Sequence, residues 1–356
     1  MDRAYATLAR VPLFKHTRLE TVELEPLGSL TNTSYKVTTD DGAYALRLPG
    51  EDTSDYINRV AEEHNARITA ATGVNAEILY FDVEDGTMLS RFVEGVAMDE
   101  ERFKGDPEAP TRAALTLRQV HGLGRIFKSR FDVFSMISDY LNILCKLQTP
   151  LSEYYYEVER EAEAVRRALE ASPVPLVPCH NDPWPRNFVN AGKRFYLIDW
   201  EFSGMNDPMW DLGDLSVEAG FGPEQDRTML EAYCGGSAPP ALYSRLTLYK
   251  AMSDLSWALW GFIQYANDNP ADDFWAYALG RFERCKTQMD DADFGKHLDD
   301  VRASHGSYAP RVHSRTKLKR EASNRRTLRR ETPSTGSPSP LTTSTPLRSA
   351  SAWNGA

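Results

Sequence analysis

The sequence predicts an α+β fold with two lobes, in which a five-stranded antiparallel sheet and one helix precede a mainly helical region. The first observation is the alternation of apolar and polar residues in Tyr35–Thr38 and Tyr44–Leu48, on either side of Asp40-Asp41-Gly42. Two such runs around a short Asp-Gly turn are typical of a β-hairpin. The second is that residues 95–310 are mostly helical in pattern, interrupted by one loop and one hairpin. An apolar fraction of 41% in 356 residues allows a sizeable core.

The first lobe is predicted to span residues 1–94. In chain order its elements are a helix over 3–10, three strands between 21 and 48, a helix over 53–72, and strands over 77–82 and 87–93. The longer helix is predicted because Ile57, Val60 and Ile68 fall on one stripe and Gly73 follows as a stop signal. The strands after it flank the turn Glu84-Asp85-Gly86, which completes a five-stranded sheet.

The chain beyond the second lobe, residues 311–356, differs in composition. It is basic as far as Arg330 and then rich in Ser, Thr and Pro. Neither part has a period that could bury one face, so we expect it to be disordered. A solvated tail is favoured over one that binds anionic lipid or nucleic acid.

The charge of the chain is unevenly distributed. Residues 311–356 hold ten Lys or Arg and two Glu, a net charge of +8, which leaves −18 on residues 1–310 because the whole chain carries −10. An acidic body disfavours nucleic acid and favours cationic small molecules. The four cysteines are far apart and lack zinc spacing, which is typical of reduced thiols. Without a signal core or a long apolar run, we expect a soluble, cytoplasmic protein.

A short polar loop carries the strongest functional signal. His180-Asn181-Asp182 is followed by Asn187, five residues after Asp182, and an apolar strand then ends at Asp199. A kinase-type phosphotransferase needs an Asp that faces the acceptor hydroxyl, an Asn five residues later for metal, and a later Asp for Mg²⁺. We therefore expect Asp182 to be the catalytic base and Asn187 with Asp199 to hold Mg²⁺, in a protein-kinase-like fold.

The segment between these residues supports that assignment. Phe188-Val189, Asn190–Lys193 and Arg194–Trp200 read as strand, turn and strand, a hairpin that returns Asp199 to the loop. Where protein kinases have Arg and Phe-Gly, this chain has Asn181 and Trp200-Glu201, so the acceptor is not expected to be a protein. The alternative is a buried polar loop with unrelated surface acids, which the combined spacing disfavours.

Several residues of the first lobe are candidates for binding ATP. Residues 27–32 form a predicted loop rich in small side chains, which would let backbone N–H groups approach phosphate. An ordinary hairpin turn would have the same composition. Arg47, on the third strand, is expected to hold the phosphates, with Glu62 as its partner and Glu63 as the competitor. The end of the last strand is expected to cover adenine. The remaining nucleotide-binding candidates are Gly28, Ser29, Thr31, Asn32, Phe92 and Val93.

Two tryptophans are candidates for the acceptor site. Trp257 and Trp260 are three residues apart and share one helical face. Indole faces attract a quaternary ammonium, which cannot donate a hydrogen bond. Core packing is the competing interpretation of this spacing. Glu201 and Glu218 could add negative charge to an acceptor site, whereas Asp207 and Asp211 are expected to brace the loop after Asp199 or cap a helix.

Taken together, these motifs resemble the choline/ethanolamine kinases, particularly the bacterial LicA-like members of the aminoglycoside-phosphotransferase-like superfamily. The matching segments are LGSLTNTSYKV, YALRLPG, INRVAEEHN, LYFD, HNDPWPRNF, LIDWEFSGMNDPMWDLGDLSVEAGF and SWALWGFIQ, between about residues 24 and 298. The resemblance implies ATP-dependent phosphorylation of a small alcohol, with Asp182 as base, Asn187 and Asp199 as magnesium ligands, and Arg47 with Glu62 at the phosphates. It also implies that Trp257, Trp260 and Glu218 lie near a choline cage.

The resemblance is incomplete at the acceptor. Animal choline kinases have Gln where this chain has Trp184, and Tyr where it has Phe202. Choline is the expected acceptor, and ethanolamine, thiamine or an aminoglycoside are the alternatives. A non-catalytic nucleotide-binding scaffold is a more remote one, because the whole metal set is present.

Overall fold

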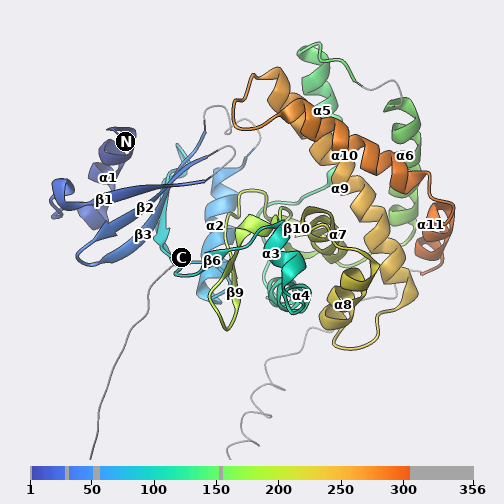
Figure 1. Ribbon diagram of the computed structural model, residues 1–356, viewed down its shortest axis with the longest axis horizontal. Helices are drawn as coiled ribbons and strands as arrows, with labels where there is room; N and C mark the ends of the chain where they lie inside the picture. Colours follow the sequence, from blue (N-terminus) through green and yellow to red (C-terminus); the bar gives the residue numbers. More distant parts are fainter. Residues whose placement is uncertain (1, 29–31, 51–56, 152–154, 305–356) are drawn as a thin grey trace, which may run out of the picture. The chain divides into compact units, whose positions relative to one another are not determined.

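The first lobe contains the antiparallel sheet that the sequence predicted, with its five strands in the order β1-β2-β3-β5-β4 (Figure 1). The computed structural model describes residues 2–28, 32–50, 57–151 and 155–304, all within one unit, Met1–Arg311. The strands are β1 (Glu23–Leu27), β2 (Thr33–Thr39), β3 (Gly42–Leu48), β4 (Ile78–Phe81) and β5 (Met88–Arg91). The predicted hairpin joins β2 to β3, where Ser34 lies opposite Arg47. Register therefore fixes the position of Arg47 in the sheet.

One face of this sheet is closed by the N-terminal segment. Helix α1 (Asp2–Arg10) buries Ala4 and Leu8 against the strands, and two 3₁₀ turns follow, η1 (Pro12–Phe14) and η2 (Leu19–Thr21). The Phe14 ring meets Tyr44 of β3 edge-on, with centroids 5.6 Å apart. Burying these rings and aliphatic side chains stabilises the sheet independently of the helical region.

Helix α2 (Arg59–Ala71) differs from its prediction. It begins at Arg59 with Asn58 as N-cap, and Val60, expected on the buried stripe, is 51% exposed. The start predicted at residue 53 lies outside the described residues. The buried face is instead partly polar, formed by Arg59, Ala61, Glu62, Asn65, Ala66 and Thr69. Val60 was wrongly placed because this helix turns charged and amide groups inward, toward the segment after Asp199, whereas Ile57 is buried and Ile68 packs against the core as predicted.

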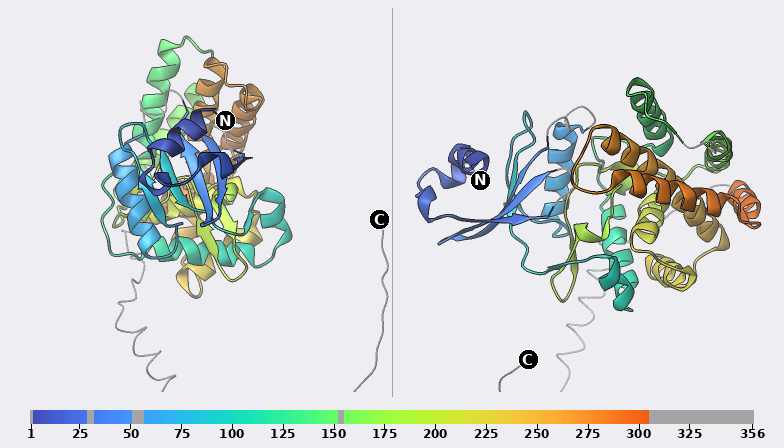
Figure 2. Two further views of the ribbon diagram at one scale, coloured as in Figure 1. Left: turned by 90° about the vertical axis from the view of Figure 1, so that its left-hand side faces the viewer. Right: turned by 45° about the horizontal axis from the view of Figure 1, so that its top comes forward.

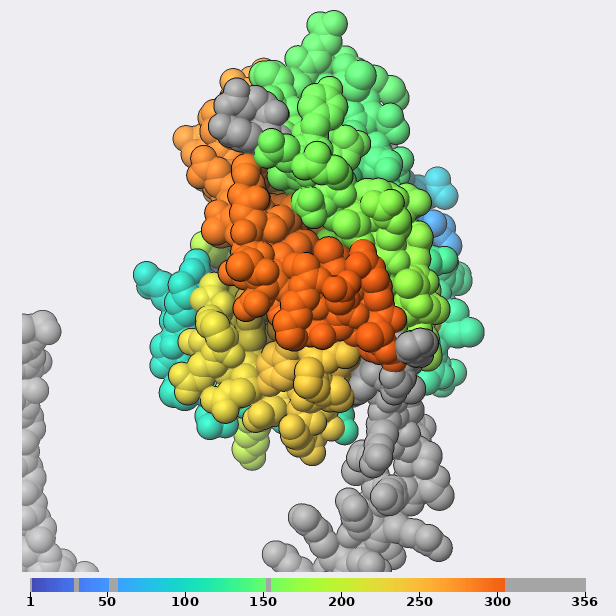
Figure 3. All heavy atoms as spheres, turned by 90° about the vertical axis from the view of Figure 1, so that its right-hand side faces the viewer, coloured from blue at the N-terminus to red at the C-terminus, as the bar shows by residue number. Residues whose placement is uncertain are grey.

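The second region is mainly helical, as predicted (Figure 2). The central helix is α9 (Pro240–Ala266), which packs against α7 (Pro208–Glu218) and α10 (Phe274–Met289). The face in Figure 3 shows α11 (Phe294–Ala303) in orange beside α6 (Tyr155–Ala171) in green, and the two are in contact. The other helices are α3 (Glu100–Gly105), α4 (Ala109–His121), α5 (Val133–Lys146) and α8 (Pro223–Cys234).

Two small sheets interrupt the helices and position the polar loop. Strand β7 (Val177–Cys179) pairs with β10 (Gly204–Asn206), while β6 (Val96–Ala97), β8 (Phe188–Asn190) and β9 (Phe195–Leu197) form the other sheet. The β8–β9 pair is the predicted hairpin. The loop 180–187, which contains the 3₁₀ turn η4 (Pro185–Asn187), therefore leaves one small sheet and enters the other.

Among the described helices, none combines the length and apolarity needed to cross a membrane. The predicted disordered tail, 311–356, lies outside the described residues. The lobe boundaries at residues 94 and 310 stay predictions.

Candidate active site

The polar loop is held from behind by Asp211 of α7. Its two carboxylate oxygens accept the backbone N–H groups of His180 and Asn181, each at 2.8 Å. Asn181 adopts a left-handed conformation, φ 69°, which few residues other than glycine take. Its side chain donates to the Phe202 carbonyl at 2.9 Å. Of the two roles that the sequence allowed for Asp211, helix cap or loop brace, the structure shows the loop brace.

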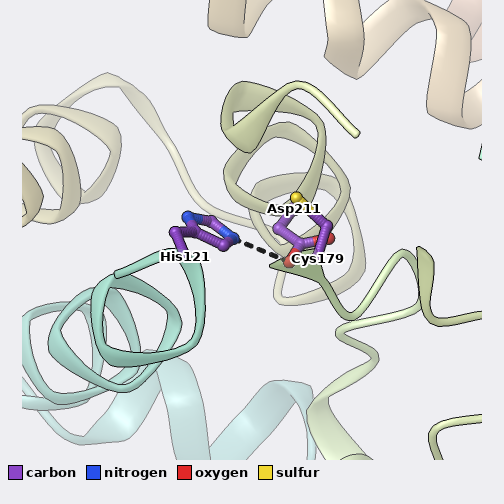
Figure 4. Close-up of side chains that lie close together, drawn as sticks. All are labelled: His121, Cys179 and Asp211. Carbon is purple, nitrogen blue, oxygen red and sulfur yellow. Dashed lines mark hydrogen bonds and ion pairs between the residues drawn. The ribbon is translucent and has the colours of Figure 1, made fainter. Parts of the chain in front are cut away.

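A buried histidine completes this brace. Figure 4 shows His121, at the end of α4, pointing toward Asp211, with Cys179 of β7 beside it. His121 Nε2 lies 2.9 Å from Asp211 Oδ2, and His121 Nδ1 lies 2.9 Å from the Tyr233 hydroxyl. The His-Cys-Asp grouping has the composition of a metal site, but both imidazole nitrogens are already hydrogen-bonded. We interpret it as structural support for the loop.

The three predicted catalytic residues converge. Asp182, Asn187 and Asp199 all line one cavity of about 920 Å³. Asn187 Nδ2 donates to the Asp182 carbonyl at 3.0 Å and to its carboxylate at 3.4 Å. Asp199 takes a left-handed conformation, φ 63°, directly after the hairpin. The hairpin holds this end of the cavity in register through the bond from Ile198 N to the Asn187 carbonyl at 2.9 Å.

Burial raises the pKa of the Asp182 carboxyl well above its usual range, and the nearby Asp214 and Asp199 carboxylates raise it further. Burial disfavours the charged form, and each neighbouring anion adds to that effect. A carboxylate with a raised pKa accepts a proton from an alcohol more readily. The site thus concentrates negative charge around the Asp182 carboxyl group.

The predicted pairing of Arg47 with Glu62 is confirmed. Arg47 Nη1 lies 2.5 Å from Glu62 Oε1 and 3.3 Å from Asp199 Oδ1, with its side chain almost fully buried. The competitor Glu63 instead pairs with Arg67 on the helix surface, at 2.9 Å. The guanidinium of Arg47 is thereby fixed next to Asp199 at one end of the cavity.

A second arginine, which the sequence analysis missed, joins this network. Arg59 Nη1 lies 2.7 Å from Glu62 Oε2 and 3.3 Å from Glu201 Oε2. Burial, and next the adjacent Asp199 carboxylate, raises the pKa of Glu201 to about 7. Two arginines therefore share two buried glutamates at the end of the cavity that Asp199 occupies.

This network argues against the acceptor role expected for Glu201. Its carboxylate faces Arg59 and Arg47, and Asn32 Nδ2 donates to it at 3.4 Å.

Ligand oxygens of Glu62, Asp199 and Glu201 lie within 4.8 Å of one another. Carboxylates and an amide oxygen are ligands that Mg²⁺ accepts, so the donor set at this end fits that ion.

The other nucleotide candidates lie partly outside the described residues. Gly28, Phe92 and Val93 line the cavity. Phe92 carries the Lys36 ammonium 4.3 Å above its ring. The positions of Ser29 and Thr31 are not among the described residues.

The tryptophan pair lines the opposite part of the same cavity. Trp257 and Trp260 are nearly perpendicular, with centroids 6.1 Å apart, and only 6% and 8% exposed. Phe202 meets Trp257 edge-on at 5.7 Å, and Tyr277 meets Trp260 at 6.0 Å. The rings therefore belong to the core and to the cavity wall at once, so the two interpretations of their spacing are compatible.

Two further charged groups shape this end. Glu218 lines the cavity as expected, but Arg281 of α10 pairs with it at 2.5 Å. Asp214 of α7 accepts the Trp257 indole N–H at 2.7 Å. Sequence reasoning missed Tyr277 and Arg281 of α10 and Asp214 of α7. The local pattern of either helix does not separate residues at the cavity from residues of the core, and α10 also lies far along the chain from the polar loop.

Comparison with known proteins agrees with this architecture. The phosphotransferase enzyme family matches residues 23–249. A solved choline/ethanolamine kinase family protein from Mesorhizobium loti is 47% identical, with a TM-score of 0.76, covering 85% of this chain and 99% of that one.

Two LicA proteins are also similar. Protein LicA of Haemophilus influenzae is 25% identical over 281 residues, 76% of this chain and 81% of LicA. A solved structure of LicA in complex with AMP is 26% identical, with a TM-score of 0.63, covering 79% of this chain and 92% of that one. The chain therefore belongs to the phosphotransferase enzyme family and, within it, is a choline/ethanolamine kinase-type phosphotransferase.

Proposed function

We propose that this protein transfers the terminal phosphoryl group of ATP to the hydroxyl of a small cationic alcohol, with choline as the acceptor. The observation that carries the proposal is that one cavity joins the Asp182 loop, the Arg47–Glu62 pair and the Trp257–Trp260 pair. These are the base, the phosphate cation and an aromatic wall for an ammonium group. A solved structure of LicA in complex with AMP supports a nucleotide as the phosphate donor.

In this mechanism, Asp182 faces the acceptor hydroxyl and takes its proton as the oxygen attacks phosphorus. Arg47, held by Glu62, contacts the phosphate oxygens and neutralises charge as the bond to the leaving ADP breaks. Asn187 and Asp199 would hold Mg²⁺, which neutralises phosphate charge when bound. Charge balance in the ligand-free site already depends on Arg47 and Arg59, which face the carboxylates of this end.

Choline is proposed ahead of ethanolamine because the acceptor wall is aromatic. Trp257, Trp260 and Tyr277 offer ring faces and edges, whereas Glu218 is already engaged by Arg281. A quaternary ammonium needs the rings, while a primary ammonium needs acceptors for its N–H groups. Ethanolamine is the second candidate, because several carboxylates surround this end of the cavity.

The direct test is release of ADP by the purified protein with ATP, Mg²⁺ and a panel of choline, ethanolamine, thiamine and aminoglycosides. We expect choline to give the highest kcat/KM. A higher kcat/KM for ethanolamine than for choline would make ethanolamine the acceptor. If the protein released no ADP with any of these alcohols, the result would instead favour a non-catalytic nucleotide-binding scaffold.

A further inference from the structure

We call the part of the cavity lined by Trp257, Trp260 and Tyr277 the acceptor end. The carboxylates around it differ in how far a neighbouring cation neutralises them. Glu218 is paired with Arg281 Nη2 at 2.5 Å, and Arg281 Nη1 also lies 3.5 Å from Asp254. An ion pair at this distance largely cancels the field of both partners on a third group. Glu218 is therefore a poor source of negative charge for an incoming ammonium group.

Asp214 lies under the aromatic wall and is fully buried. Its Oδ1 accepts the Ser253 hydroxyl at 2.6 Å and the Trp257 indole N–H at 2.7 Å, and both donors are neutral. Its Oδ2 is buried without a hydrogen-bond partner. Within the described part of the chain, no Lys, Arg or His lies within ion-pair distance of Asp214, in contrast to Glu218. A buried carboxylate without a counter-charge is costly unless a cation is supplied.

The groups around Asp214 are mostly acidic or neutral. Burial, and next the Glu218 carboxylate, raises the pKa of Asp214 well above its usual range. The groups that face it are Glu218 from α7, Ser253 and Trp257 from α9, Arg281 from α10 and Asp182 from the polar loop. Only Arg281 among them is a cation, and it is committed to Glu218. A positive ligand at the acceptor end would offset this excess of acid.

We propose that Asp214 is a positioning and specificity residue, which fixes the Trp257 ring and supplies the negative charge that makes the acceptor site prefer an ammonium alcohol to a neutral one. This rests on the proposed function, which it deepens. Trp257 lines the cavity, whereas Asp214 is not among the lining residues, so the carboxylate acts through the ring.

The geometry of an indole explains how this works. Its N–H lies in the ring plane, so the acceptor Asp214 leaves the ring faces open to a ligand. An anion at the N–H makes the ring more electron-rich, which strengthens the attraction of its face for a cation. The ring also separates Asp214 from the cavity, so the ligand need not donate a hydrogen bond. That arrangement suits a quaternary ammonium.

Asp214→Asn tests the proposal, because the amide carbonyl can still accept from Ser253 and Trp257 while the charge is removed. Each amine alcohol is paired with a neutral analogue that has carbon in place of nitrogen: choline with its carbon analogue, ethanolamine with propanol. KM and kcat are measured for all four, and binding is followed by calorimetry without ATP. We expect the KM of the preferred amine alcohol to rise roughly ten-fold, well below the effect of a charge in direct contact, because Asp214 acts on the ligand through the ring. The KM of its neutral analogue should stay within about two-fold.

Ser253→Ala is the matched control, since it removes a donor from the same oxygen but leaves the carboxyl group. It should keep the ratio of amine to neutral kcat/KM. Equal losses for both alcohols in Asp214→Asn, or an unchanged ratio, would overturn the proposal. If Asp214→Asn does not fold, Trp257→Phe, which keeps an aromatic ring without the N–H, must lower the same ratio.

Failure of the proposed function is separable from failure of this inference. A wild-type protein that binds choline more tightly than the neutral analogue but does not phosphorylate it would refute the function alone. A wild-type protein that phosphorylates choline, with a ratio that Asp214→Asn leaves intact, would refute the inference alone. Equal wild-type affinity for every amine and its neutral analogue would refute the inference.

Discussion

At the scale of single residues, the proposed base Asp182 is the first target for mutation. Its carboxyl lies within the field of Asp214, Asp199 and Glu218, and Asn187 contacts both its carbonyl and its carboxylate. We expect Asp182→Asn to lower kcat by about 10²–10⁴, the usual contribution of a positioned base. ATP affinity, measured by calorimetry, should change little. Asp139→Asn, at an exposed position of α5, is the control. Turnover of Asp182→Asn within a few-fold of wild type would remove Asp182 from this role.

Trp257 can be tested by comparing acceptors. Because a quaternary ammonium depends on ring faces, Trp257→Ala should raise the KM for choline far more than the KM for ethanolamine. The measurement is steady-state ADP release with each alcohol at saturating ATP. Equal losses for both alcohols would indicate that the ring, which is 6% exposed, acts only in core packing.

The residue scale also shows what sequence reasoning can reach. Asp182, Asn187 and Asp199 are found because a loop and a hairpin place them together over short separations. Arg59 and Asp214 were missed because their positions depend on packing between distant elements. Glu201 was assigned to the acceptor on charge alone, and only the structure shows which arginines it faces.

At the scale of elements, the brace between α7 and the polar loop is the most consequential contact. Asp211→Ala would leave the buried N–H groups of His180 and Asn181 unpaired, along with His121 Nε2. We expect a loss of about 2–5 kcal/mol in the free energy of unfolding, measured in urea, together with a lower kcat. Asp132→Ala, which removes the N-cap of α5, should cost about 1 kcal/mol and leave kcat unchanged. Similar losses for the two variants would mean that the brace is no more than an ordinary cap.

Helix α2 shows where element prediction fails. Its existence was predicted from a periodic stripe, but Val60 is exposed and Glu62 and Asn65 are buried. Asn65 Nδ2 donates to the Ser203 carbonyl at 3.1 Å, a contact across 138 residues of sequence. Apolar periodicity assumes that a helix packs on a hydrophobic core, and α2 instead packs part of its face on the segment that follows Asp199.

At the scale of the whole molecule, the acid-rich acceptor end should make stability depend on pH. The folded-state pKa of Asp214 is raised above its ordinary value of 3.8, mainly by burial. The folded state therefore binds the proton more tightly than the unfolded state, and stability is lost as pH rises through the folded-state pKa. We expect the Tm of ligand-free protein to fall as the pH rises from 3.8 toward the folded-state pKa, and Asp214→Asn to reduce that fall.

Differential scanning calorimetry across a pH series measures this effect. Added choline should reduce the fall in Tm with rising pH in the wild type more than its neutral analogue does, because a bound cation favours ionised Asp214. Identical pH slopes for wild type and Asp214→Asn would show that this carboxyl does not control the pH dependence.

The fold as a whole was accessible from sequence, whereas the acceptor end was not. The sheet follows from local alternation and turn residues, so its five strands could be predicted one hairpin at a time. The acceptor end combines α7, α9 and α10 with the polar loop, and its charge balance depends on pairs such as Glu218 with Arg281. Asp214 and Glu218 are four residues apart on α7, and no local period encodes which of the two carboxylates pairs with Arg281.

The length of α9 has a consequence for how this protein could diverge. Arg245 and Tyr249 near its start hold Asp207, the N-cap of α7, while Trp257 and Trp260 farther along line the cavity. Because α9 is one continuous helix, which turns by about 100° per residue, the number of residues between the two groups fixes the directions in which their side chains point. Substitutions in the later turns can change the wall and leave the anchor in place. A one-residue insertion between Tyr249 and Trp257 would rotate the indoles away from the cavity, so this stretch of α9 should tolerate replacement and resist changes of length.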